Sequence, residues 1–190
     1  MRLAAGVAAF AAVSIALSGC VPVVVAGAAG GAAMVATDRR TTGTQVDDEG
    51  IELKMGQQIT AQYGERVNVN VTSYNGVVLL TGEVPDQGVW ASIGSMAKNM
   101  PKVRVVQNEL VIAQPSDLSQ RTNDSYITSK VKTRFIEASK FAPNVVKVVT
   151  ERGVVYLMGI VTRQEGDAAG EIAAGTDGVV KVVKVFEYRA

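Results

Sequence analysis

The stretch that decides the fold reads VNVNVTSYNGVVLLTGEV (Val67–Val84), and it recurs later in the chain as NVVKVVTERGVVYLMGIV (Asn144–Val161). At a shift of 77 residues the two stretches are identical at eight of eighteen positions. The identical pairs are Val69/Val146, Val71/Val148, Gly76/Gly153, Val77/Val154, Val78/Val155, Leu80/Leu157, Gly82/Gly159 and Val84/Val161. They follow a strand–turn–strand pattern, so the simplest account is two copies of one small domain.

Each copy of the stretch predicts a β-hairpin. In the first copy, valines alternate with Asn and Thr before Tyr74-Asn75-Gly76, as in a half-buried strand. Asn-Gly accepts the positive φ angles that tight turns demand, and Glu151-Arg152-Gly153 takes that place in the second copy. The returning strand, Val77–Val84, is apolar on both faces for part of its length, which indicates a central strand.

Helical periodicity precedes and follows each hairpin. Leading helices are expected at about 50–63 and about 125–139, and final strands at 103–112 and 179–188. Between hairpin and final strand, Pro85-Asp86 opens a helix in the first copy, whereas Thr162 and Glu165 form a capping-box pattern in the second. The helix of the first copy has an apolar stripe made of Val89, Ile93, Met96, Ala97 and Met100. We therefore predict an α+β fold of two tandem α-β-β-α-β domains, each a three-stranded mixed sheet with two helices on one face.

The composition argues against nucleic-acid binding, catalysis and metal binding. The chain has 19 Lys and Arg against 18 Asp and Glu, so it lacks the broad basic field of a nucleic-acid binder. It has no His, which removes the commonest general base and metal ligand, and only one Cys. No Gly-x-Ser-x-Gly or comparable nucleophile setting occurs. We expect no enzyme activity, no cofactor, no metal and no nucleic-acid partner.

The N-terminus has the pattern of a secretory signal that ends in a lipid attachment site. Met1-Arg2 is a minimal positive region, and Leu3–Leu17 is an apolar segment rich in Ala. The sequence Leu17-Ser18-Gly19-Cys20 that follows resembles the bacterial lipobox, in which the Cys is acylated and becomes the first residue of the mature chain. We therefore predict a signal peptide at 1–19 and lipidation of Cys20. Val21, rather than Asp, favours the outer membrane, by resemblance to enterobacterial sorting rules.

An uncleaved transmembrane anchor is the rival interpretation of this segment, because residues 3–36 carry no charge. Pro22 and the Gly27–Gly31 cluster make a poor helix interior, and Ala and Gly contribute little transfer free energy. The segment fits better as a flexible tether. We assign residues 20–47 to the lipidated Cys and its tether or linker, 48–113 to the first domain and 122–190 to the second.

Two further features have a purely structural interpretation and a functional one. Asp47-Asp48-Glu49 lacks the spacing of an EF-hand, so an exposed linker or helix N-terminus is favoured over a cation site. Trp90, the only Trp, is expected to pack between the two domains, and a docking surface is its alternative role.

The leading helix of the second copy is basic. Five cations lie between residues 121 and 140 against two acids, Asp124 and Glu137. Ile127, Val131 and Phe135 form a stripe expected to face the core, and Tyr126, Lys130 and Arg134 form the neighbouring stripe. An aromatic ring with cations beside it suits a lipid headgroup region, although such cations are more often only the solvated face of a helix.

The whole layout resembles a known family. Gly153–Val161 and Gly178-Val179-Val180-Lys181-Val182-Val183 are similar to the glycine turn, the strand ending in Gly-x-Val and the Gly-Val-x-x-Val step of the BON domain. The first copy departs from it, with Pro101-Lys102-Val103 in place of the Gly-Val step. With a lipobox, a tether and two such units, the chain resembles the dual BON-domain outer-membrane lipoproteins of the DolP type over essentially its full length.

The resemblance implies a function for the basic helix. Members of this family face the periplasm from the outer membrane, support envelope integrity and bind anionic phospholipid through this helix. Residues carried over as phospholipid-binding are Tyr126, Ile127, Ser129, Lys130, Val131, Arg134 and Ile136. Family members tend to have a larger aromatic residue at the Tyr126 position, so shallower insertion is expected here. The alternative is an adaptor whose sheet faces or edges recruit envelope-assembly proteins without recognising lipid.

Overall fold

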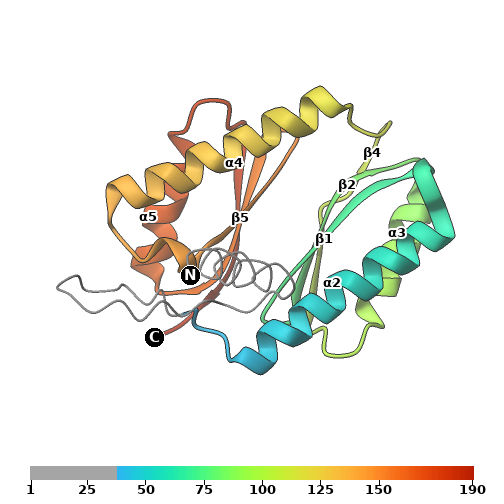
Figure 1. Cartoon of the computed structure of the whole chain (residues 1–190), viewed down its shortest axis with the longest axis horizontal. Coiled ribbons are helices and arrows are strands. Elements are labelled where there is room, and N and C mark those ends of the chain that lie inside the picture. The colour runs from blue at the N-terminus through green and yellow to red at the C-terminus, as the bar shows by residue number, and fades with distance from the viewer. Residues whose placement is uncertain (1–37) are drawn as a thin grey trace, which may run out of the picture. The chain divides into compact units, whose positions relative to one another are not determined.

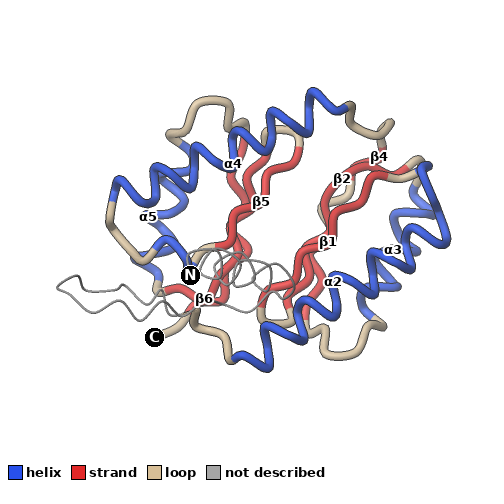
Figure 2. Tube along the Cα trace, viewed as in Figure 1, coloured by secondary structure: helices blue, strands red, loops and turns tan. Residues whose placement is uncertain are grey.

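The computed structural model describes residues 38–190, all of which belong to one compact unit. Two α-β-β-α-β domains follow each other in this part of the chain (Figures 1 and 2). The first domain comprises α2 (Thr42–Tyr63), β1 (Asn68–Tyr74), β2 (Val77–Val84), α3 (Gln87–Lys98), β3 (Val105–Asn108) and β4 (Val111–Ile112). The second comprises α4 (Leu118–Ala138), β5 (Lys147–Glu151), β6 (Val154–Val161), α5 (Arg163–Ala174) and β7 (Lys181–Tyr188). Short 3₁₀ turns, η1 (Gly64–Arg66) and η2 (Pro143–Val145), join each leading helix to its hairpin.

Both sheets are mixed, as predicted. Strand β2 is central, antiparallel to β1 and parallel to β3 and β4, and β6 occupies the same place between β5 and β7. Helices α2 and α3 cover one face of the first sheet, and α4 and α5 cover one face of the second (Figure 1). The predicted fold class, two tandem domains of this topology, is confirmed.

Both leading helices begin earlier than predicted. Residues 42–47, which the sequence places in the linker, already belong to α2, because the Thr41 side chain caps this helix by accepting a hydrogen bond from Thr44 N at 3.1 Å. Helix α4 begins at Leu118, since the Asp117 carboxylate accepts from Gln120 N at 2.8 Å. The capping box of Thr162 and Glu165 is formed as predicted, and it starts α5.

The prediction that Trp90 packs between the domains is wrong. Trp90 packs against the core of its own domain, and its indole N–H donates to the carbonyl of Leu110 at 3.0 Å. The Leu110 N–H is bound at 3.3 Å by the side chain of Asn108. The Glu109 N–H still donates to the carbonyl of Leu80 at 2.9 Å, so the pairing with β2 is interrupted at Leu110, and the single strand expected at 103–112 is divided into β3 and β4.

A buried aspartate joins each leading helix to its hairpin turn. Asn75 and Gly76 have positive φ angles of 53° and 73°, which turn their two N–H groups toward α2. Asp48 accepts both of them, at 2.7 and 2.9 Å, as well as the Ser73 hydroxyl at 2.7 Å. In the second domain, Asp124 accepts Arg152 N and Gly153 N, both at 2.8 Å.

Of the two interpretations given for the acidic segment, the exposed linker is wrong for Asp48, which lies in the N-terminal part of α2 and is only 2% exposed. Burial acts to raise the pKa of its carboxyl, but the hydrogen bonds from Ser73, Gly76, Arg40 and Asn75 outweigh burial and lower the pKa below its usual value. The folded protein therefore stabilises the carboxylate form of Asp48.

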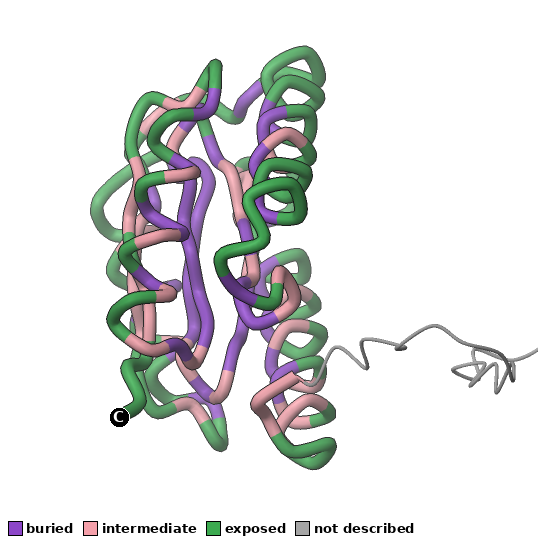
Figure 3. The backbone as a smooth tube through the Cα atoms, turned by 90° about the vertical axis from the view of Figure 1, so that its left-hand side faces the viewer, coloured by how far each residue is buried: buried purple, intermediate pink, exposed green. Residues whose placement is uncertain are grey.

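The second faces of the two sheets pack against each other. Tyr74 and Leu79 from the first sheet form one buried cluster with Tyr156 and Met158 from the second. Figure 3 shows buried strands between helices that expose their outer sides. Each domain thus has two apolar layers, one under its helices and one shared with its neighbour.

Two buried glutamates lie at the rim of this shared layer. Glu151 accepts a hydrogen bond from Asn70 of the first domain at 2.9 Å. Burial raises the pKa of Glu151, the Asn70 bond partly opposes this, and the nearby charges of Glu83 and Asp124 raise the pKa further. Glu83 behaves oppositely, because bonds from Ser116, Asn68 and Arg152 outweigh its burial and lower its pKa.

Removing the Asp48 carboxylate should destabilise the protein strongly. We expect Asp48→Ala to lower the free energy of unfolding by about 3 kcal/mol, because two buried N–H groups lose a charged acceptor. Asp47→Ala is the matched control: Asp47 neighbours Asp48 on α2 but forms only an exposed ion pair with Lys102, so its cost should stay below about 1 kcal/mol. Urea unfolding measures both, and equal losses would contradict the role given to Asp48.

Neutralising Glu151 should stabilise the protein in a pH-dependent way. Its pKa in the folded state is raised above the ordinary value of 4.5. Folding therefore favours the protonated form, and the carboxylate costs stability once the pH rises above 4.5. Below that pH both states are protonated and the cost disappears. We expect Glu151→Gln to be more stable than wild type at pH 7, with the difference vanishing on acidification. Exposed Glu49→Gln is the control, and a pH-independent difference for Glu151→Gln would contradict the assignment.

Candidate functional site

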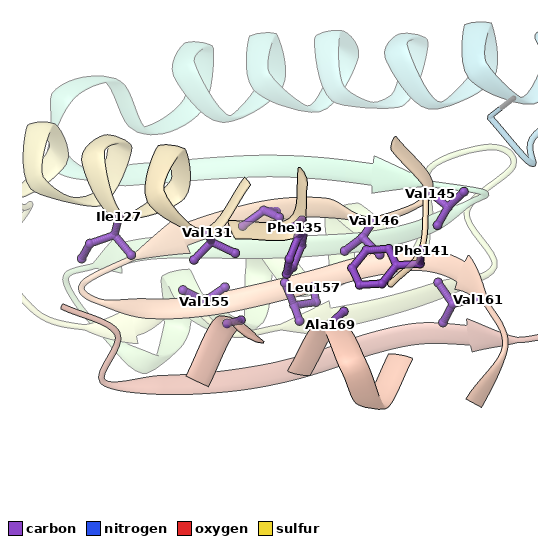
Figure 4. Packing of buried hydrophobic residues seen from close by; sticks show 12 residues of the cluster. Ile127, Val131, Phe135, Phe141, Val145, Val146, Val155, Leu157, Val161 and Ala169 are labelled. Carbon is purple, nitrogen blue, oxygen red and sulfur yellow. The ribbon is translucent and has the colours of Figure 1, made fainter. Parts of the chain in front are cut away.

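Helix α4 packs one narrow stripe on its own sheet. Asp124, Ile127, Val131 and Phe135 are buried at intervals of three and four residues. Figure 4 shows Ile127, Val131 and Phe135 lying over the sheet with Leu157 beneath them, and the Phe135 ring meets Phe141 edge-on at 5.0 Å between centroids. This packing fixes which way the rest of α4 faces.

The seven predicted lipid-binding residues are divided by this packing. Ile127 and Val131 are in the core, so they do not reach the surface and are not available to a membrane. The predicted lipid contact of these two residues is wrong because they belong to the same buried stripe as Phe135. Tyr126 and Ile136 are 62% and 63% exposed, and Ser129, Lys130 and Arg134 also reach the surface.

Four of these surface residues line one open groove. Tyr126, Ser129, Lys130 and Arg134 border a cavity of about 470 Å³ between α4 and the loop at 175–177. Ile136 is not in it but lines a second groove, of about 390 Å³, with Asp38 and Arg40. The predicted site is therefore two adjoining surfaces of α4 rather than one pocket.

The two cations of the first groove are held by backbone carbonyls. The Lys130 ammonium donates to the carbonyl of Asp177 and lies 4.8 Å from the centre of the Tyr126 ring. The Arg134 guanidinium donates to the carbonyl of Gly175 and to the Thr176 hydroxyl at 3.3 Å. These neutral acceptors fix the positions of both cations, and neither cation forms a salt bridge among the described residues, although Glu137 and Asp177 also line the groove and balance its formal charge.

Leu118 is a surface residue that sequence reasoning missed. Its side chain is 79% exposed on the first turn of α4, where it borders a further groove with Tyr126. Leu118 and Ile136 are 18 residues apart, which is five turns at about 3.6 residues per turn, so they point the same way. Asp117, a strong capping residue directly before Leu118, is the signal that would have found the earlier helix start.

The equivalent helix of the first domain has a different outer surface. Aligning the two aspartates that cap the turns, Asp48 with Asp124, also aligns the buried stripe of α2 with that of α4. The positions equivalent to Leu118, Tyr126 and Ile136 are then Thr42, Gly50 and Thr60. Helix α2 instead exposes Val46 and Leu53, with Lys54 beside Leu53. The two helices differ in charge, since α2 carries one cation and four acids whereas α4 carries four cations and two acids.

The described residues contain neither a membrane-spanning helix nor a metal-binding cluster. Among residues 38–190, no helix is both long and apolar enough to span a membrane. The same residues contain no group of three or more potential ligands placed to hold a metal ion. The predicted lipidation at Cys20 and its rival, a transmembrane span at 3–36, both lie outside the described residues.

Comparison with known proteins agrees with the duplicated topology. The family model described as BON domain matches residues 47–114 and again 123–190. The chain belongs to the BON-domain family. The two matches account for both halves of the internal repeat.

Relatives match the chain over most of its length. The chain is 42% identical over 174 residues to the outer membrane lipoprotein DolP of Haemophilus influenzae, which covers 90% of each protein. It is 37% identical over 153 residues to a 21 kDa hemolysin of Actinobacillus pleuropneumoniae, covering 80% of this chain and 79% of that one. The osmotically-inducible protein Y of Escherichia coli is 28% identical over 144 residues, covering 74% and 72%. The resemblance to the dual BON-domain, DolP type is thus confirmed.

The carbonyl bonds of the groove can be tested without lipid. We expect Arg134→Ala to accelerate amide hydrogen exchange at Thr176–Val179 by about fivefold, because the loop loses a charge-assisted bond worth about 1 kcal/mol. Lys132→Ala is the control, since Lys132 is on the same helix but lines the other groove. Unchanged exchange in Arg134→Ala would show that the loop does not depend on this side chain.

Proposed function

We propose that this chain is an outer-membrane lipoprotein that supports cell-envelope integrity and binds anionic phospholipid through α4. The relationship to DolP, named an outer membrane lipoprotein, supports the location. The periplasmic face, the lipid on Cys20 and the phospholipid contact are parts of the proposal. One observation carries the phospholipid contact: Leu118, Tyr126 and Ile136 are exposed along the outer side of α4, with cations on both flanks.

The arrangement suits a helix lying in the plane of a membrane surface. Lys130 and Arg134 flank the apolar residues on the side of the first groove, and Lys132 flanks them on the side of the second. An interfacial helix needs an apolar strip that enters the headgroup boundary and cations that meet anionic lipid beside it. The rest of the outer side consists of small hydroxyl residues such as Thr122, Ser129 and Thr133, which permit close approach.

The membrane contact of α4 is weak by itself, and the lipid anchor on Cys20 would strengthen it. Each cation near an anionic surface contributes about 1 kcal/mol, and three exposed apolar residues add a shallow insertion. Acyl chains on Cys20 would hold the helix near the bilayer, so the second contact forms at high effective concentration. With Tyr rather than a larger aromatic at position 126, the free energy of insertion is modest.

The alternative function, a protein-interaction adaptor, depends on open sheet surfaces. The sheet faces are covered in the described residues, because each sheet packs against helices on one side and against the other sheet on the second. One sheet edge, with Val105, Val111 and Ile112 exposed, is the surface that favours an adaptor. Such an adaptor would not depend on the cations of α4.

A vesicle-binding assay tests the proposal. Residues 37–190, without the anchor, should bind vesicles that contain anionic phospholipid and not purely zwitterionic ones. We expect Tyr126→Glu, which adds a negative charge in place of the ring, or Lys130→Glu, which reverses a charge, to weaken this binding by about tenfold or more.

Matched controls lie on the equivalent helix of the first domain. Leu53 of α2 is 63% exposed, as Tyr126 is on α4, and Lys54 occupies the position equivalent to Lys130. Leu53→Glu and Lys54→Glu should leave binding unchanged. Equal binding to both kinds of vesicle, or equal losses in the α2 variants, would rule out a specific contact by α4. Cellular cross-links to discrete proteins that survive Lys130→Glu would favour the adaptor instead.

A further inference from the structure

The residues that lead from the tether into the fold contact both domains. Arg39 places its guanidinium on the second domain, with two hydrogen bonds of 2.7 Å to the Glu165 carboxylate and one of 2.8 Å to the carbonyl of Ile160. Both side chains of this ion pair are largely buried, and the Arg39 hydrogen bonds lower the pKa of Glu165 to about 2. A bidentate, partly buried Arg–carboxylate pair fixes the relative orientation of the two side chains as well as pairing their charges.

The next residue contacts the first domain. Arg40 donates to Asp48 at 2.9 Å and lies over the Tyr74 ring at 4.1 Å from its centre. Asp38 braces the same guanidinium through Nη2 at 2.7 Å. Asp48 is the residue that caps the hairpin turn, and Tyr74 belongs to the cluster between the sheets. Arg40 is therefore attached to the interior of the first domain and to the joint.

A second contact of this kind, from the segment before a leading helix to the other domain, occurs at the entry to the second domain. Ser116, directly before the cap of α4, donates through its N–H at 3.0 Å and through its hydroxyl to Glu83 of the first domain. Glu83 and Ile160 are equivalent positions of β2 and β6, at the repeat shift of 77. In each case the segment before a leading helix binds the end of the other domain's central strand.

The entry point lies beside α4. Asp38 and Arg40 line the groove of about 390 Å³ together with Lys132 and Ile136. The tether thus joins the described part of the chain next to the exposed side of the helix that carries the candidate membrane contact.

From these contacts we infer that Asp38–Arg40 is a clasp, which holds the two domains together at the tether entry and so presents α4 to the membrane in one orientation. Without Arg39, the tether would attach to the first domain alone, because α2 begins at Thr42. The second domain would then be coupled to the tether only through the apolar layer between the sheets and the remaining polar contacts across it, so it would move more freely relative to the anchor. Arg39 is a positioning residue, and only the membrane half of this inference rests on the proposed function.

A distance measurement on the full-length acylated chain in vesicles tests the clasp. Spin labels on Lys54→Cys in α2 and Glu171→Cys in α5 report on both domains from exposed positions. We expect one narrow distance distribution for the otherwise unchanged chain, and about a twofold broadening in Arg39→Ala. Glu165→Gln should broaden it as well while keeping an acceptor for the Thr162 N–H that caps α5.

Arg104→Ala is the matched control. Arg104 also forms an ion pair between the domains, with Glu187, but both side chains are exposed, so its loss should leave the distribution narrow. Broadening in Arg39→Ala and Glu165→Gln, with normal hydrogen exchange in the cores of both domains, would support the clasp. A distribution as narrow as that of Arg104→Ala, or broadening only where a core has unfolded, would overturn it.

The same samples also test separately whether the clasp orients α4 toward the membrane. Hydrogen exchange of α4 should be slowed in anionic vesicles, and Arg39→Ala should lose much of this protection although its α4 residues are intact. No protection of α4 in any sample would refute the proposed lipid contact while leaving the distance result to decide the clasp. Full protection in Arg39→Ala would overturn the orienting role.

Discussion

The carboxylate of Asp48, with its counterpart Asp124, is the constraint on which the rest of the structure depends. A tight hairpin with two residues of positive φ leaves two N–H groups without a strand partner, and buried N–H groups need an acceptor. An aspartate at one position of the leading helix supplies it. This bond fixes the rotation of each helix over its sheet, and therefore which residues it buries and which it exposes. The outer side of α4 is a consequence of where Asp124 is held.

Divergence between the two copies gives one fold two different outer surfaces. The capping aspartates, the central strands and the buried stripes are equivalent in both domains. What differs is the outer side of the leading helix and the set of side chains at the joint. Gly50 and Thr60 occupy the positions that Tyr126 and Ile136 hold in the second domain. The apolar layer between the sheets then makes the pair of domains one unit, with the tether entering at its edge.

Predictions from the sequence succeeded where a signal is local. The Asn-Gly turn, the central position of Val77–Val84 and the capping box of α5 each depend on residues within a few positions of one another, and all three are observed. Predictions failed where a partner is distant. Asp48 among other acids is indistinguishable from an exposed linker residue until Ser73 and the turn are brought to it. The expectation that Trp90 lies between the domains is wrong because nothing near it in the sequence identifies Leu110 as its acceptor.

By itself the sequence determined the repeat, the order of strands and helices, the mixed sheets and the stripe of α4 that faces the core, since periodicity encodes which side of an element is apolar. The tertiary structure alone decided that the sheets pack against each other, that Lys130 and Arg134 are held by the 175–177 loop, and that Ile136 lies in a different groove. It also decided the pairing of Arg39 with Glu165, 126 residues away. Such contacts depend on the three-dimensional path of the chain, and no spacing along the sequence encodes them.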